Sequence, residues 1–72
     1  MAFIFINSKP GAEEELMEEL KEIPEVKEAH MIFGVYDIIA RVEAVNKEAL
    51  KGVINRIRHL EKVKSTLTMV CM

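Results

Sequence analysis

The segment Phe33-Gly34-Val35-Tyr36-Asp37 sets the topology of this chain, because it joins two runs with the composition of β-strands. The runs are residues 26–33 and 36–45. Gly34-Val35 is then a two-residue connection with glycine first. A type II′ hairpin turn needs a positive φ at that position, which only glycine adopts at low cost. The sequence therefore predicts a β-hairpin at the middle of the chain.

Asp37 is the only aspartate in the chain, and it lies directly after this turn. A lone carboxylate beside exposed turn backbone can hold the ammonium group of a small ligand. It can equally be a solvated turn residue, since aspartate favours turns for local reasons. The local sequence leaves both interpretations open.

The hairpin is flanked on each side by a helix and a strand. Residues 2–7 are rich in β-branched and aromatic residues, which predicts a strand. Pro10-Gly11 separates this strand from a helix predicted over residues 11–22. After the hairpin, Asn46 is a good N-cap for a helix over residues 47–59, and residues 63–71 predict a last strand. The order β-α-β-β-α-β predicts a ferredoxin-like α+β fold, with a four-stranded antiparallel sheet and two helices on one face.

Two helices cover one face of such a sheet, and the sequence is too apolar for the other face to meet only water. An Ile pair or a Phe pair of the first strand must be left over, and Tyr36, Ile38, Ala40 and Val42 are expected to face the helices. We expect Ile39, Val45, Thr66, Thr68 and Val70 on the uncovered face. An exposed apolar patch on a small domain indicates an interface. The prediction is a symmetric homodimer that packs sheet against sheet, as a dimeric α/β barrel-like sandwich.

The size of the chain supports association. Seventy-two residues form one domain, half of the residues are hydrophobic, and one cysteine permits no internal disulfide. A core of this size is marginal without additional support, and oligomerisation is the support that remains.

Composition argues against several classes of function. The net charge is −2 with no basic run, so direct nucleic-acid binding is not expected. No stretch has the length and apolarity of a membrane helix, and the N-terminus lacks a signal peptide, which predicts a cytoplasmic protein. His30, His59 and Cys71 have no metal-ligand or nucleophile spacing, and no glycine-rich phosphate loop is present. We therefore predict no metal, no cofactor and no catalytic residue.

The G-x-Y-D turn at Gly34–Asp37, together with the strand Val63-Lys64-Ser65-Thr66-Leu67-Thr68-Met69-Val70, resembles the effector (RAM) domain of the Lrp/AsnC regulators across essentially all 72 residues. The resemblance implies sheet-paired dimers that assemble to octamers or decamers, with an amino-acid effector bound between dimers. Family members usually carry a preceding helix-turn-helix domain. This chain begins at the first RAM strand, so we expect a stand-alone domain that does not bind DNA itself and would modulate full-length relatives.

By position, the resemblance implies a ligand site of seven residues. Gly34, Val35 and Tyr36 would offer backbone groups, and Asp37 would bind the α-ammonium or orient the turn. Ser65, Thr66 and Thr68 would offer hydroxyl groups, although Thr66 and Thr68 are also ordinary strand residues.

Two other functions are compatible with the same fold. The first is a cofactor-free enzyme of the monooxygenase type, which needs polar groups in the helix-facing core or a deep cavity lined by His30 or Asn7. The second is a ligand-free structural partner, whose assembly would not respond to amino acids. Fold class alone does not separate the three.

Overall fold

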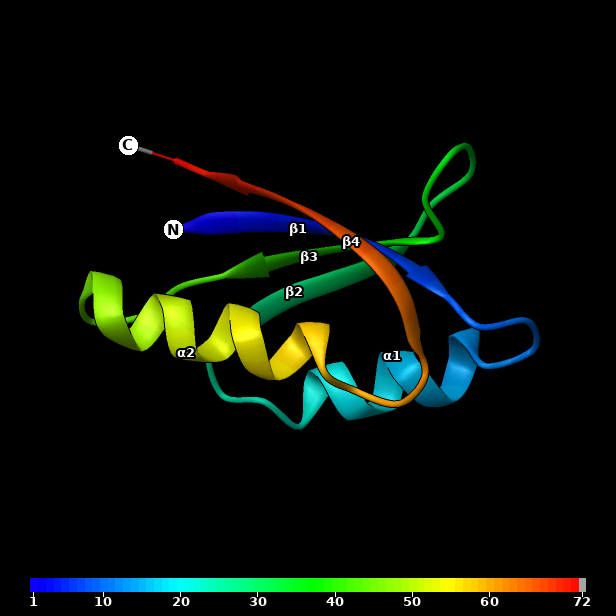
Figure 1. Cartoon of the computed structure of the whole chain (residues 1–72), viewed down its shortest axis with the longest axis horizontal. Helices are drawn as coiled ribbons and strands as arrows, with labels where there is room; N and C mark the ends of the chain where they lie inside the picture. The colour runs from blue at the N-terminus through cyan, green and yellow to red at the C-terminus, as the bar shows by residue number, and fades with distance from the viewer. Residues whose placement is uncertain (72) are drawn as a thin grey trace.

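The structure, a computed structural model, describes residues 1–71 and has the element order β-α-β-β-α-β (Figure 1). The strands are β1 (Ala2–Ser8), β2 (Val26–Met31), β3 (Ile38–Val42) and β4 (Val63–Val70), and the helices are α1 (Glu13–Lys21) and α2 (Lys47–Arg58). The strands pair antiparallel in the order β2-β3-β1-β4. The predicted ferredoxin-like fold is confirmed.

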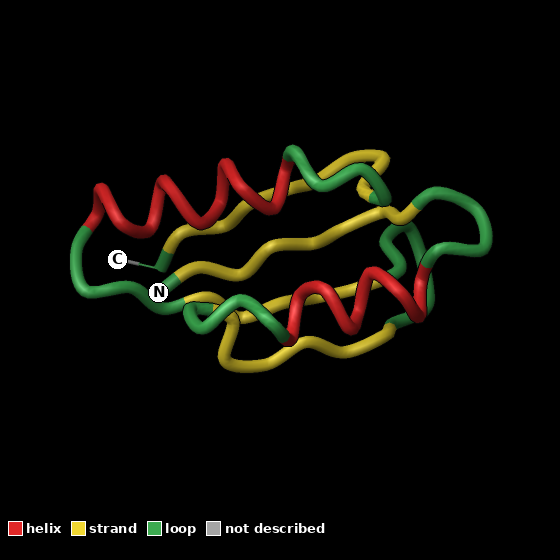
Figure 2. Tube along the Cα trace, turned by 90° about the horizontal axis from the view of Figure 1, so that it is seen from below, coloured by secondary structure: helices red, strands yellow, loops and turns green. Residues whose placement is uncertain are grey.

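Both helices lie on the same face of the sheet, and Figure 2, which views the molecule from below, shows them in front of the strands. The opposite face is uncovered in the single chain. We call it the open face. The core therefore forms one layer, between the helices and the inner side of the sheet.

β1 is flanked on both sides by other strands, and its alternation determines which side chains enter the core. Ile4 and Ile6 are fully buried beneath the helices, whereas Phe3 and Phe5 point to the open face. The buried hydrophobic residues are Ala2, Ile4, Ile6, Leu16, Leu20, Ile23, Ile38, Ala40, Val42, Leu50, Val53 and Ile57. Ile38, Ala40 and Val42 face the helices, as their alternation along the strand predicted.

The helix ends follow local chemistry. Asn46 is the predicted N-cap of α2, and its Oδ1 accepts the backbone N–H of Ala49 at 2.8 Å. Three glutamates, Glu13 to Glu15, occupy the first turn of α1, where the helix dipole favours negative charge. Pro24 follows that helix and prevents its continuation.

The predicted two-residue hairpin turn is wrong. The β2–β3 ladder ends at the pair Met31 and Ile38, and residues 32–37 form a longer loop. The physical reason is that Asp37 bonds to β1: its N–H donates to the carbonyl of Ile6 at 3.0 Å. Gly34 does have the expected positive φ, 127°.

The predicted strand faces are also corrected in part. Thr66 and Thr68 lie opposite Ile6 and Ile4, so they share the helix-facing side instead of the open face, and Val70 lies opposite Ala2. Ile39 is on the open face as predicted, since it pairs with Phe5.

Tyr36 and Val45 lie outside the strands in which they were placed. Val45 follows the end of β3, in the connection to α2. Tyr36 precedes β3 and does not join the helix-facing row, because its ring packs against Phe5 of the open face.

Truncation of a buried apolar side chain should lower the free energy of unfolding more than truncation of an exposed one. Ile4→Ala removes a fully buried side chain from β1 and is expected to lower the free energy of unfolding by about 2–5 kcal/mol. Val45→Ala, at a position 95% exposed, should stay within about 0.5 kcal/mol. Urea unfolding monitored by circular dichroism measures both, and equal costs would contradict the assigned core.

Candidate functional site

The base of the 32–37 loop is held by hydrogen bonds to β1. The carboxylate oxygen Oδ2 of Asp37 accepts two hydrogen bonds from Ser8, one from its backbone N–H at 3.0 Å and one from its hydroxyl group at 3.2 Å. The N–H of Ile32 donates to the Asp37 carbonyl at 2.8 Å and closes the loop. Of the two roles considered for Asp37, the contacts support orientation of the loop.

The apex of the loop has a different character from its base. Phe33 is 105% exposed and Val35 is 82% exposed. Gly34 lies between them, and a Cβ added there would meet no atom within 4 Å. The backbone groups at the apex are therefore accessible to a ligand or to another protein surface.

Tyr36 connects this loop to the open face. Its ring centroid lies 5.8 Å from that of Phe5, with the planes tilted by 50°. This distance is within the range of favourable aromatic pairs. The loop and the apolar centre of the sheet therefore form one continuous surface.

The three hydroxyl residues predicted on β4 do not lie together. Ser65 is on the open face, where its Oγ accepts the side-chain N–H of Asn7 at 3.2 Å. Thr66 and Thr68 point to the helix side and are half-buried. The seven predicted residues are thus divided among the loop, the open face and the helix side, and the structure does not gather them around one cavity.

The centre of the open face is apolar. Phe3 pairs with Arg41 and Met69, and Phe5 pairs with Ile39 and Leu67. Leu67 is 48% exposed and Met69 is 56% exposed, although each could have been polar at no cost to this chain's own core. We call the set Phe3, Phe5, Ile39, Leu67 and Met69 the apolar strip.

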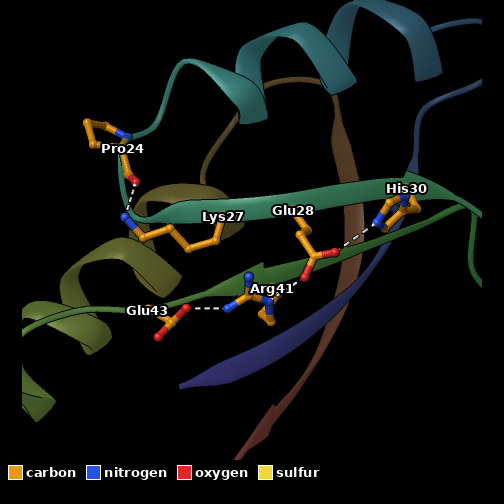
Figure 3. A network of polar contacts seen from close by, with 6 residues as sticks. All are labelled: Pro24, Lys27, Glu28, His30, Arg41 and Glu43. Carbon is orange, nitrogen blue, oxygen red and sulfur yellow. Dashed lines mark hydrogen bonds and ion pairs between the residues drawn. The ribbon is translucent and has the colours of Figure 1, made fainter.

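A polar network borders the apolar strip at the β2–β3 side (Figure 3). Arg41 Nε donates to Glu28 Oε2 at 2.5 Å, and its Nη1 donates to Glu43. His30 Nε2 lies 3.4 Å from Glu28 Oε1. The sequence analysis missed this cluster, because the residues come together only through the register that pairs Glu28 with Arg41.

The network shifts the titration of its members. The hydrogen bond from Arg41 holds the pKa of the Glu28 carboxyl below its ordinary value, and the hydrogen bond from His30 acts in the same direction. The hydrogen bonds to Glu28 and then to Glu43 raise the pKa of the Arg41 guanidinium. The contact therefore favours the ionised carboxylate of Glu28 and the protonated guanidinium of Arg41.

The helix-facing core is almost entirely apolar in the described residues. Among residues 1–71, Ser8 is the only buried polar residue, and no group of three His, Cys, Asp or Glu residues has the geometry to hold a metal ion. His30 and Asn7 lie on the open face and do not line an internal cavity. In the same part of the chain, neither helix has the length and hydropathy of a membrane span.

Comparison with known proteins identifies a family model and several relatives. A family model described as the Lrp/AsnC ligand binding domain matches residues 1–72. The chain is 37% identical over 73 aligned residues to an uncharacterized HTH-type transcriptional regulator, PF0250, from Pyrococcus furiosus. The alignment covers 96% of this chain and 49% of that protein, so the chain spans about half the length of this curated relative.

Solved structures show the same similarity in three dimensions. FFRP-DM1 superposes with a TM-score of 0.95 at 39% identity, covering 99% of this chain and 96% of the other. A transcriptional regulator from Neisseria meningitidis, NMB0573, solved as an L-Met complex, has a TM-score of 0.86 at 18% identity, covering 99% of this chain and 48% of that one. The second similarity concerns the fold alone.

The hydrogen bonds between Asp37 and Ser8 should contribute measurably to stability. Asp37→Ala leaves two donors of Ser8 without their acceptor, and it should lower the free energy of unfolding by about 1–3 kcal/mol. Ser8→Ala removes only the hydroxyl contact and should cost less, about 0.5–1.5 kcal/mol. Urea unfolding gives both values. An Asp37→Ala variant as stable as the parent would show that the carboxylate does not hold the loop.

A further prediction concerns the polar network. Because the pKa of Glu28 is lowered, the contribution of its contacts is present above the ordinary value of 4.5 and is lost as the pH falls through the lowered pKa. Arg41→Met should return the pKa of Glu28 towards that ordinary value, as measured by carboxyl ¹³C NMR titration. Lys27→Met is the control, since its ammonium bonds to the Pro24 carbonyl and not to Glu28. A lowered pKa that persists in Arg41→Met would refute the assignment.

Proposed function

This chain belongs to the Lrp/AsnC ligand-binding domain family, and on that premise we propose that it is a self-associating sensor of a free amino acid. The observation that carries this proposal is the apolar strip on the open face. Two copies would pack these faces together, and an effector bound at the 32–37 loop would alter how the resulting dimers assemble.

Several properties of the open face support pairing with a second copy. The apolar strip occupies its centre, and the Arg41 network and the Asn7–Ser65 pair lie at its borders. An apolar centre with a polar rim is the usual anatomy of a protein interface. A face that pairs with itself needs a two-fold axis, so the expected unit is a symmetric dimer.

The 32–37 loop supports an amino-acid ligand on chemical grounds. A free amino acid needs donors for its carboxylate, an acceptor for its ammonium group and a place for its side chain. The exposed backbone at Gly34, Val35 and Tyr36 supplies donors and acceptors, while Asp37 keeps that backbone in place. Ser65 can contribute from the open face, whereas Thr66 and Thr68 could reach a ligand only on the helix side. The L-Met complex of the Neisseria regulator supports this class of effector.

Co-assembly with larger relatives is the second part of the proposal. PF0250 is an HTH-type transcriptional regulator by name, and the chain resembles about half of it. Dimers that contain one copy of each would link the amino-acid response to a DNA-binding protein. Assembly of dimers to octamers or decamers is the form that the family resemblance favours.

Sheet pairing predicts a specific response to one added charge. Leu67→Glu puts a carboxylate in the apolar strip and should prevent sheet pairing, giving monomer in sedimentation velocity, because a buried unpaired charge is costly. Asn55→Glu adds the same charge on the exposed side of α2 and should sediment as the parent does. Equal sedimentation of the two variants would contradict pairing through the open face.

Effector binding is tested by isothermal titration with each of the twenty amino acids. At least one should bind at micromolar to millimolar concentration, and Gly34→Ala should weaken it about tenfold or more, because the strained φ of 127° displaces the loop. Gly52→Ala is the matched control, since its Cβ also meets no atom within 4 Å but the position is helical. The absence of binding by all twenty would reject the sensing role and leave the structural-partner hypothesis.

A further inference from the structure

The polar network contains one side chain of a type that takes up a proton near neutral pH. This side chain is His30, because histidine is the residue whose charge ordinarily changes between about pH 5 and 8. Figure 3 shows its ring on β2 directed towards Glu28, whose carboxylate also accepts a hydrogen bond from Arg41 of β3. Glu28 itself stays ionised over this range, since Arg41 holds the pKa of its carboxyl below the ordinary value of 4.5.

The register of the sheet places His30 at the end of a row on the open face. His30 pairs with Ile39, and Ile39 pairs with Phe5, so two members of the apolar strip lie in the same row. β2 is the outer strand of the sheet, and the side chain of His30 is 65% exposed in the single chain. A second copy that covers the apolar strip therefore reaches His30 at the edge of the contact, where water still has access.

The net charge of the network depends on whether His30 carries a proton. With a neutral imidazole, the carboxylates of Glu28 and Glu43 outnumber the single guanidinium of Arg41, which leaves one uncompensated negative charge. A proton on His30 supplies the missing positive charge, 3.4 Å from Glu28. When a second sheet excludes water from the network, a net charge is more costly than a balanced set of ion pairs. Symmetric pairing brings two such networks into one dimer.

Two lysines near His30 oppose its protonation through like-charge repulsion. Lys21 of α1 and Lys27 of β2 line a shallow groove together with His30 and Glu28. Both lysines are exposed, and the ammonium group of Lys27 is bonded to the carbonyl of Pro24. Exposed charges that do not touch are screened by salt, whereas the Glu28 carboxylate is in contact with the imidazole. Glu28 therefore has the larger effect on His30.

We propose that His30 couples sheet pairing to pH, because its protonation balances the charges of the Glu28–Arg41–Glu43 cluster at the border of the interface. The paired state then takes up protons relative to two separate chains, so the affinity between copies rises as the pH falls. The inference rests on the proposed sheet pairing and adds a second input to it. An amino acid would act at the 32–37 loop, whereas a proton acts at the polar network.

Dilution of the full chain at about pH 7.5 and about pH 5.5, at constant ionic strength, tests the inference across the range in which histidine titrates. Sedimentation equilibrium gives the half-dissociation concentration, at which half of the chains are monomeric. One exposed ionic contact on each of two subunits is worth about three- to tenfold in affinity, so the parent should have a half-dissociation concentration lower by that factor at the lower pH. His30→Gln should have the same half-dissociation concentration at both pH values. His59→Gln is the matched control and should respond as the parent does, because its ring lies at the end of α2 against the carbonyl of Asn55.

Glu28→Gln is a second test that leaves His30 in place. This variant removes one carboxylate, so the network is already balanced with a neutral imidazole, and a proton then adds an uncompensated positive charge. The tighter association at low pH should therefore be lost. A parent with equal half-dissociation concentrations at both pH values, or a His30→Gln variant that keeps the parental response, would overturn the inference alone. Failure of sheet pairing is distinguishable, because the parent would then be monomeric at both pH values or Leu67→Glu would sediment as the parent does; either result would overturn both proposals.

Discussion

Two helices can cover only one side of a four-stranded sheet, and the pairing of β1 with its two neighbours determines which side chains remain on the other. Ile4 pairs with Ala40 and Thr68 on the covered side, and Phe5 pairs with Ile39 and Leu67 on the open side. A shift of one residue would exchange the two sets, because side chains alternate along a strand. The burial of Ile4 and Ile6 fixes this register, and the apolar strip is its consequence.

The loop between β2 and β3 is held to the fold at its base, whereas the side chains at its apex are exposed. Asp37 joins the loop to β1, while Phe33 and Val35 project from it. A ligand at the backbone of Gly34 to Tyr36 would therefore lie next to these two exposed apolar side chains. In the proposed scheme, binding and assembly are coupled because Tyr36 of the loop packs against Phe5 of the apolar strip, and coupling of this kind is reciprocal.

Much of the fold follows from the sequence. The cap at Asn46 and the alternation from Ile38 to Val42 each have a local cause, and each was predicted. The faces of β4 were assigned incorrectly, because its more apolar row, which contains Leu67 and Met69, lies on the open face, while Thr66 and Thr68 face the helices. Only the pairing with β1 decides between them. The two-residue turn was wrong for a similar long-range reason: the N–H of Asp37 bonds to the carbonyl of Ile6 in β1, and its carboxylate bonds to Ser8.

Methionine oxidation by hydroxyl radicals compares the two faces within one molecule. Met31 and Met69 are 51% and 56% exposed in the single chain, and they lie on opposite sides of the sheet. Burial of the open face against a second copy predicts that Met69 becomes protected as the protein concentration rises, while Met31 continues to react. Equal oxidation of both residues at every concentration would contradict sheet pairing through the open face.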